Sequence, residues 1–261
     1  MNSILVSGTS GFIGHHLSSR LGNRCTPFDP RVDFDYGSLP KNEITTIIHL
    51  GAPSNRDHEA EEKIVDTAKK IFLGIHKCPW VDVIFSSSIR VFGQGGVISA
   101  NEFPIPKDGY GRGKVTAEGI FRQLSDGRNV DIFRISNVQG IDHRGNYRGV
   151  AGIFSNQSKN GKISVNGDGS SVKDIIHVSE VVDSIIWALG KKGRGVQTHC
   201  LGRNAISLSE LSELISTRTG SEITYTNEDP YDLSVWYDEE THLREYGKPI
   251  FVEGILDELL M

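Results

Sequence analysis

The opening of the chain, SILVSGTSGFIGHHL, limits most strongly what the protein can fold into. Residues 3–8 predict a strand and residues 12–22 a helix, with Gly8, Gly11 and Gly14 at the turn between them. A strand that enters a helix through a tight glycine turn is the start of a parallel β-α-β unit. The N–H groups at the helix start and the positive end of its dipole face whatever approaches the turn. The stretch therefore predicts an α/β fold with an anion site at this turn.

The rest of the first half repeats this alternation of strands and helices. Further strands are expected around 26–28 and at 44–52, 81–88 and 129–136, with helices at 61–75 and 114–124. Near-continuous apolar strands separated by helices are typical of a parallel sheet covered on both faces. The pattern loosens after Gly140, although Ser207 and Glu210 form a capping box at the start of another helix. We therefore expect an α/β protein with a doubly wound parallel sheet.

Composition and charge narrow the class of protein. The chain has 261 residues, with 28 basic and 33 acidic side chains, so its net charge is −5. A mildly acidic chain without a basic block is a poor binder of nucleic acid. The apolar run Ile4–Val6 is too short for a signal peptide or a membrane span. Three widely separated cysteines indicate reduced thiols, so we expect a cytoplasmic protein without nucleic-acid or membrane partners.

Asp29 stands about twenty residues after the glycine turn, where the next predicted strand ends. A carboxylate at this position can accept hydrogen bonds from the two ribose hydroxyls of adenosine, and it repels a 2′-phosphate. This favours NAD as the cofactor. NADP stays possible because Arg31 lies nearby, and Asp29 could instead be an ordinary turn residue before Pro30.

Several motifs, in order along the chain, resemble those of the extended short-chain dehydrogenase/reductase family of nucleotide-sugar epimerases and dehydratases. They are GTSGFIG (8–14), HLGA (49–52), FSSSIRVFG (85–93), YGRGK (110–114), RISNVQG (134–140) and GDGSSVKDIIHV (167–178), with a weaker match at DEETHLREYGKP (238–249). The resemblance implies a Rossmann-type dinucleotide-binding domain over 1–140. It also implies a small C-terminal α/β lobe over 141–261 that binds substrate and does not fold independently.

The resemblance also implies which residues hold the cofactor, and it implies no metal. The expected cofactor contacts are Gly8, Ser10, Gly11, Phe12, Ile13, Asp29, Asp33, Leu50, Gly51, Ala52, Ser86, Tyr110, Lys114 and Ile135.

The same resemblance assigns catalysis to Ser88, Tyr110 and Lys114. Lys114 follows Tyr110 by four residues, so both project from one face of a helix. A tyrosine has an ordinary pKa near 10, and a neighbouring ammonium together with a nicotinamide ring would lower it toward the working range. Ser88 would hold the same substrate oxygen. A cofactor along this face would explain the small Gly113, whereas a plain surface helix is the alternative interpretation.

The substrate side departs from the family pattern. The resemblance places Ser88, Arg90, Asn137 and Lys173 at the nucleotide sugar, but Lys173 stands where the family has Arg. A lysine neutralises phosphate without binding it bidentately. The Thr-Asp-Glu of sugar 4,6-dehydratases is absent at 88–90, which disfavours elimination of water.

The sequence thus predicts an NAD-dependent enzyme on a nucleotide sugar, a 4-epimerase in the first place. The alternatives are an NADPH-dependent 4-ketoreductase, which the short interval after Asp29 favours, and a non-catalytic dinucleotide sensor. Reduction of a steroid or flavonoid ketone is disfavoured by the nucleotide-sugar motif at 167–178. The resemblance also implies a homodimer through the predicted helix 114–124, where Ile120, Phe121 and Leu124 would offer an apolar edge. Burial of these side chains within the monomer is the alternative.

Overall fold

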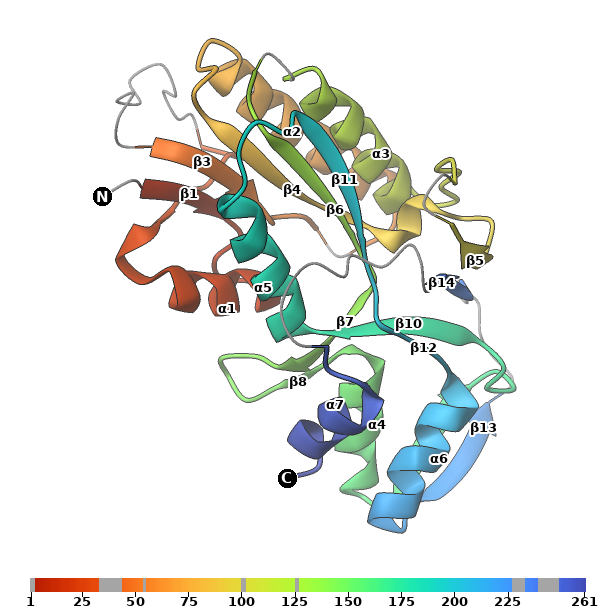
Figure 1. The fold of residues 1–261 in the computed structure, drawn as a ribbon. Helices are drawn as coiled ribbons and strands as arrows, with labels where there is room; N and C mark the ends of the chain where they lie inside the picture. Colours follow the sequence, from red (N-terminus) through yellow and green to blue (C-terminus); the bar gives the residue numbers. More distant parts are fainter. Residues whose placement is uncertain are drawn as a thin grey trace. The chain divides into compact units, whose positions relative to one another are not determined.

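The chain forms two units in a computed structural model, which describes most of its residues (Figure 1). The described residues are 3–32, 44–53, 55–99, 102–124, 127–226, 233–238 and 249–261. The first unit consists of residues 1–93, 103–135 and 182–199, and the second of 94–102, 136–181 and 200–261. It stays a prediction that residues 141–261 form a small lobe and that this lobe does not fold independently.

A six-stranded sheet with the order β2-β1-β3-β4-β6-β11 organises the first unit. Its elements are β1 (Ser3–Ser7), α1 (Phe12–Leu21), β2 (Cys25–Pro27), β3 (Ile44–His49), α2 (His58–Ile75), β4 (Asp82–Ser88), α3 (Gly109–Arg122), β6 (Val130–Ile135), α5 (Val178–Leu189) and β11 (Val196–Leu201). The pairs β1–β2, β1–β3, β3–β4 and β4–β6 are all parallel. The strand order reverses between β1 and β3, so the predicted doubly wound sheet is confirmed.

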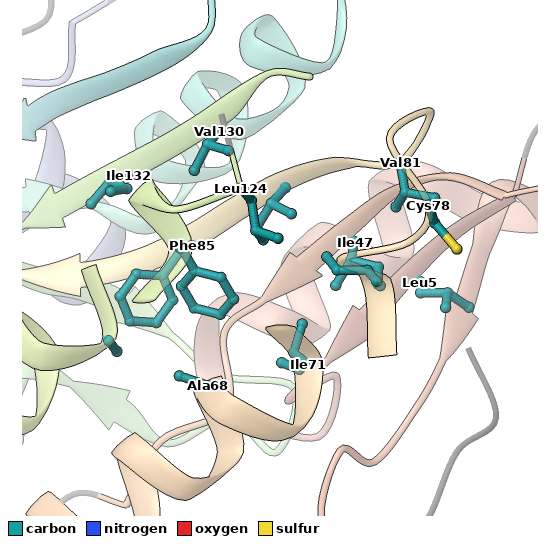
Figure 2. Packing of buried hydrophobic residues seen from close by; sticks show 14 of the residues in the cluster. Leu5, Ile47, Ala68, Ile71, Cys78, Val81, Phe85, Leu124, Val130 and Ile132 are labelled. Atoms are coloured by element: carbon teal, nitrogen blue, oxygen red, sulfur yellow. The ribbon is translucent and has the colours of Figure 1, made fainter. Parts of the chain in front are cut away.

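Helices cover both faces of this sheet, α2 and α3 on one and α1 and α5 on the other (Figure 1). The apolar runs predicted as strands are the buried centre: Ile47, Val83, Phe85 and Ile132 are fully buried. In Figure 2, Phe85 lies near Leu124, and Ile71 of α2 lies below Ile47 of β3. Strands buried on both faces read as continuous apolar runs, which is why the sequence locates them within a few residues.

Helix α3 begins at Gly109, five residues before the predicted start, and Asp108 caps it by accepting a hydrogen bond from the Gly111 N–H at 2.7 Å. The YGRGK segment is therefore the first part of the helix. A Cβ on Gly109 would lie 2.0 Å from the Asp57 carbonyl oxygen, and one on Gly111 2.5 Å from that of Arg90. The expectation that a cofactor explains Gly113 is wrong, because α2 packs there, with the Glu61 Cα 3.1 Å from the position of an added Cβ.

The apolar edge expected for a dimer is also corrected. Phe121 is fully buried and Leu124 is 2% exposed, both in the core of the first unit, and Ile120 packs against that core. These side chains are used within one chain, so they give no support to a second copy. The homodimer stays a prediction.

The second unit has its own sheet with the order β5-β14-β10-β7-β8, and β12 pairs with β10. Its elements are β5 (Gly96–Ile98), β7 (Asn137–Ile141), β8 (Tyr147–Arg148), α4 (Gly149–Ser158), β9 (Lys162–Asn166), β10 (Val172–His177), β12 (Asn204–Ser207), α6 (Leu208–Thr219), β13 (Glu222–Thr226), β14 (Val235–Tyr237) and α7 (Val252–Leu259). Strands β9 and β13 form a separate parallel pair. The predicted capping box of Ser207 and Glu210 is confirmed at the start of α6, and α4, α6 and α7 share an apolar core.

Two expectations fall on residues outside the described ranges. They are Asp33 as a cofactor contact and most of the tail motif over 238–249. Within the described ranges, none of the helices combines the length and the apolar character that a lipid bilayer would require.

The packing of α3 generates a prediction about its glycines. Gly109→Ala should destabilise the protein by about 1–3 kcal/mol, because the added methyl group meets a backbone oxygen that cannot move away by itself. Gly119→Ala on the same helix is the matched control, since nothing lies within 4 Å of its Cβ position. The control should gain about 0.5–1 kcal/mol from the better helix former. Urea denaturation measures both, and equal effects would contradict the packing argument.

Candidate active site

A cavity of about 850 Å³ lies in the first unit, at the carboxyl ends of β1, β2 and β3. It is the end of a doubly wound sheet where the strand order reverses, which is the usual ligand position in such sheets. Seven of the predicted cofactor contacts line it: Gly8, Ser10, Gly11, Asp29, Leu50, Gly51 and Ala52.

The glycine turn beneath this cavity is closely packed. Gly8 has a φ of 79°, and a Cβ there would lie 2.7 Å from the Gly51 nitrogen. A Cβ on Gly14 would lie 2.0 Å from the Gly8 carbonyl oxygen. Helix α1 begins at Phe12 after Gly11, which offers no side-chain cap to the first N–H groups of the helix. A bare helix start beside glycines fits a pyrophosphate.

Asp29 lies in the cavity wall, where the sequence predicted it, but its carboxylate already has a partner. The Arg31 guanidinium donates to both oxygens, with Nε 2.9 Å from Oδ1 and Nη2 2.7 Å from Oδ2. The hydrogen bonds from the Arg31 side chain and backbone lower the pKa of Asp29 to about 2. Asp29 is therefore ionised, and any ribose hydroxyl would share it with Arg31.

Helix α2 contributes cavity residues that are not among the predicted cofactor contacts. Lys63, Asp66, Thr67 and Lys70 all line the cavity, and Lys70 Nζ donates to the Arg31 carbonyl oxygen at 3.1 Å. Their spacing of three and four residues places them on one face of the helix. That spacing was visible in the sequence, but only the packing of α2 shows that the face borders the cavity.

Tyr110 and Ser88 are brought together as predicted. Ser88 ends β4, Tyr110 lies in the first turn of α3, and the two side chains are hydrogen-bonded. Burial raises the pKa of Tyr110 to about 12, although the Ser88 hydrogen bond and the Arg90 charge oppose this. The lowered pKa expected from the sequence is therefore not found in the protein by itself, where the phenol is protonated at neutral pH.

Lys114 lies one turn after Tyr110 and is buried, with 1% of its surface exposed. Its Nζ donates to the Ser86 carbonyl oxygen at 2.6 Å and lies 5.5 Å from the centre of the Tyr110 ring. Burial lowers the pKa of Lys114 to about 7, while the Glu118 charge raises it. The ammonium is thus close to the phenol, as predicted, and titrates near neutrality.

His49 lines the cavity and is also close enough to Lys114 for the Lys114 charge to act on it. Its Nδ1 lies 2.6 Å from the Ser7 hydroxyl, and its ring stacks on Phe85 at 5.7 Å. Burial, and next the Lys114 charge, lower the pKa of His49 to about 3. His49 is therefore neutral at physiological pH. His49 belongs to the HLGA motif, but nothing in the sequence places it near Lys114.

Arg90 has a partner within the first unit. Its guanidinium forms an ion pair with Asp108, the residue that caps α3, and Arg90 Nε lies 2.9 Å from Asp108 Oδ2. Its charge acts on Tyr110 and lowers the pKa of that phenol. Contact with a substrate stays a prediction for Arg90.

The remaining predicted residues are placed as follows. In the second unit, Asn137 Nδ2 donates to the Asp174 carbonyl oxygen at 2.9 Å, and Lys173 Nζ to that of Leu233 at 3.2 Å. Asn137 on β7 pairs with Ile175 on β10, two residues after Lys173. Six predicted cofactor contacts of the first unit are not among the cavity-lining residues: Phe12, Ile13, Ser86, Tyr110, Lys114 and Ile135. Of these, Ile135 ends β6 beside Ser88.

Comparison with known proteins identifies relatives over most of the chain. The dTDP-4-dehydro-6-deoxyglucose reductase of Escherichia coli is 25% identical in sequence, and the match covers 88% of this chain and 85% of the reductase. UDP-arabinose 4-epimerase 1 of Arabidopsis thaliana is 26% identical, covering 84% of this chain and 68% of that protein. The solved structure of MoeE5 in complex with UDP-glucose and NAD has a TM-score of 0.81 at 22% identity, covering 99% of this chain and 97% of MoeE5.

The likeness to MoeE5 concerns the fold, and it agrees with the doubly wound sheet of the first unit. The family assignment comes from the sequence profile of the NAD dependent epimerase/dehydratase family, an enzyme family, which matches residues 37–201. The match covers more than half of the chain and includes the segments of Ser88, Tyr110 and Lys114. The chain therefore belongs to the NAD dependent epimerase/dehydratase family.

Proposed function

We propose that the protein is an NAD-dependent enzyme that acts at carbon 4 of a nucleotide-activated sugar, and that it is a nucleotide-sugar 4-epimerase. The observation that carries the proposal is the position of the Tyr110 phenol. It is hydrogen-bonded to Ser88 and lies one helical turn from the buried Lys114 ammonium. The 4-epimerase among the relatives supports it. So does MoeE5, whose structure holds UDP-glucose and NAD.

The described residues fit a dinucleotide. The closely packed Gly8 and the uncapped start of α1 would hold the pyrophosphate, and Asp29 would hold the adenosine ribose. Leu50, Gly51 and Ala52 would line the nicotinamide side of the cavity. When bound, the nicotinamide supplies the reversible hydride acceptor.

Tyr110 is the proposed general acid and base. With a pKa of about 12 its phenol carries a proton at neutral pH, and it can give this proton to a sugar oxygen that gains charge. Ser88 accepts a hydrogen bond from the Arg90 N–H at 3.2 Å, which fixes its hydroxyl beside Tyr110. In the opposite direction Tyr110 has to lose its proton, and Ser88 and Arg90 are the groups that favour the phenolate.

A second candidate function is a nucleotide-sugar 4-ketoreductase. The protonated phenol is the form that a ketone reduction requires, and Arg31 on Asp29 offers a cation to a 2′-phosphate. The Escherichia coli reductase, matched over 88% of this chain, supports the same candidate. In either function, Asn137 and Lys173 are proposed to bind the nucleotide part of the substrate.

One experiment separates the two functions. The purified protein is examined by absorbance and mass for a retained nucleotide, and is then incubated with nucleotide sugars and their 4-keto forms. A 4-epimerase retains NAD and interconverts C4 epimers without net consumption of NADH. A 4-ketoreductase consumes NADH or NADPH in equal amount to the keto sugar. If neither reaction occurs with any nucleotide sugar, both proposals are wrong.

Tyr110→Phe should lower single-turnover hydride transfer by about 10²–10⁴-fold, the usual contribution of a positioned acid or base. The variant keeps the ring, so cofactor affinity should change only a few-fold. Ser88→Ala should lower turnover less, because water can replace its hydrogen bond. Near-normal hydride transfer in Tyr110→Phe would contradict the assigned role.

Lys114→Met should abolish most activity and weaken cofactor binding, yet stabilise the fold at neutral pH by about 1–3 kcal/mol. Lys114 is charged in the unfolded chain up to its ordinary pKa of 10.5, but only up to about 7 in the folded protein. Below pH 7 the full penalty of the buried charge is present, and it diminishes as the pH rises toward 10.5. The gain of the variant, followed by thermal melting from pH 6 to 10, should therefore shrink with pH. A less stable variant at pH 7 would contradict this.

Asp29 and Arg31 should affect cofactor choice in opposite directions. Asp29→Ala frees the Arg31 guanidinium and should increase the affinity for NADPH relative to NADH. Arg31→Ala frees both oxygens of Asp29 and should shift the preference toward NADH. Dissociation constants of both nucleotides for the two variants and the wild type test this. If neither substitution changes the affinity for NADPH, Asp29 does not select the cofactor.

A further inference from the structure

Glu118 is a buried carboxylate that the proposed mechanism does not use. It lies one helical turn after Lys114 on α3, as Lys114 lies one turn after Tyr110, so the three share a face of the helix. Only 3% of its surface is exposed. A buried carboxylate is costly unless it is paired and hydrogen-bonded, so its partners indicate what it does.

Two partners from adjacent strands hold Glu118. Arg134 on β6 binds it bidentately, with Nε 3.0 Å from Oε1 and Nη2 2.7 Å from Oε2. The Ser87 hydroxyl on β4 donates to Oε1 at 2.6 Å, and Ser87 and Arg134 are register partners between the two strands. The carboxylate is therefore fixed between α3 and the two strands, one helical turn after Lys114.

Each element that packs around Lys114 contributes titratable, charged or polar groups to its surroundings. Helix α3 contributes Tyr110 and Glu118, strand β3 the neutral His49, and strand β6 the guanidinium of Arg134 beside Glu118. The Arg90–Asp108 pair acts on Tyr110, and the charged side chains of α2 that line the cavity beside His49 are Lys63, Asp66 and Lys70. Strand β4 contributes the Ser86 carbonyl oxygen and the Phe85 ring, 4.8 Å from Nζ.

We propose that Glu118 is a positioning residue whose carboxylate keeps the buried Lys114 charged at the pH where the site works. Arg134, in turn, partly neutralises the Glu118 charge and so weakens its effect on Lys114. The inference rests on the proposed function, because it assumes that the charged form of Lys114 is the active one.

The charges of Glu118 and Arg134 decide in which direction each substitution moves the pKa of Lys114. Burial lowers the pKa of Lys114 and the Glu118 charge opposes this. Without Glu118 this negative charge would no longer oppose the effect of burial, so the ammonium form of Lys114 would be disfavoured further. Without Arg134 the full charge of Glu118 would act on Lys114 and favour its ammonium form. The two halves of one ion pair therefore have opposite effects on one lysine, which no purely structural role would produce.

The test compares Glu118→Gln, Arg134→Gln and wild type in the complete protein. NMR titration of the lysine side chains, with Lys114→Met to assign the signal, gives the midpoint of Lys114 directly. The midpoint should fall by about one pH unit or more in Glu118→Gln and rise by a similar amount in Arg134→Gln. The alkaline limb of the pH profile of turnover should move in the same two directions. Ser87→Ala removes a hydrogen bond without removing a charge, so it is the matched control, and its midpoint should stay near the wild type.

The outcomes separate this inference from the proposed function. Midpoints that do not move, or that move in the same direction in both variants, would overturn the role of Glu118. Opposite shifts of Lys114 without any effect on turnover would leave that role intact and contradict the catalytic role of Lys114. If a single variant does not fold, Arg122→Ala serves instead. The Arg122 side chain is 40% exposed with Nη2 3.5 Å from Glu118 Oε2, and its removal should raise the midpoint by a smaller amount. A lower or unchanged midpoint in this variant would equally overturn the proposal.

Discussion

The close packing of α3 against the start of α2 and the end of β4 is the constraint on which the candidate site depends. Gly109 and Gly111 let backbone carbonyls approach where a side chain would collide. The helix is therefore held with one face against the sheet, and Tyr110 and Lys114 lie on that face. Two glycines near a helix start weaken the isolated helix, but here close tertiary contact requires them. The site is thus positioned by backbone contacts rather than by its own polar groups.

The same packing buries the charged side chain of Lys114, and neighbouring groups compensate part of the cost. A lysine with 1% of its surface exposed is an unfavourable charge. The Ser86 carbonyl oxygen accepts a hydrogen bond from its ammonium, and Glu118, which is itself paired with Arg134, supplies a counter charge. A neutral His49 adds no second cation. We expect an apolar residue at 114 to make the fold more stable, so under the proposed function this position is one where chemistry and stability are opposed.

The cavity beside this cluster combines a general and a particular feature. The glycine turn and the uncapped start of α1 would suit any dinucleotide, because they offer backbone N–H groups and space. The Asp29–Arg31 pair is particular, since it presents a carboxylate and a cation at one place. We therefore expect the choice between NAD and NADP to depend on which of the two side chains is released from the other. The family relationship concerns the fold and the enzyme class, whereas this pair is a property of the present chain.

The sequence by itself determined the parallel sheet, the glycine turn, the capping box of α6 and the common helix face of Tyr110 and Lys114. Continuous apolar strands and i,i+4 spacing are local signals that follow directly from chain geometry. The tertiary structure alone decided the start of α3 at Gly109, the burial of Phe121 and Leu124, the α2 wall of the cavity and the salt bridge from Glu118 to Arg134. These features depend on which distant segments meet, and spacing along the chain carries no information about that. The pKa of Tyr110 shows the difference most clearly, because proximity to Lys114 could be predicted, but the dominant effect of burial could not.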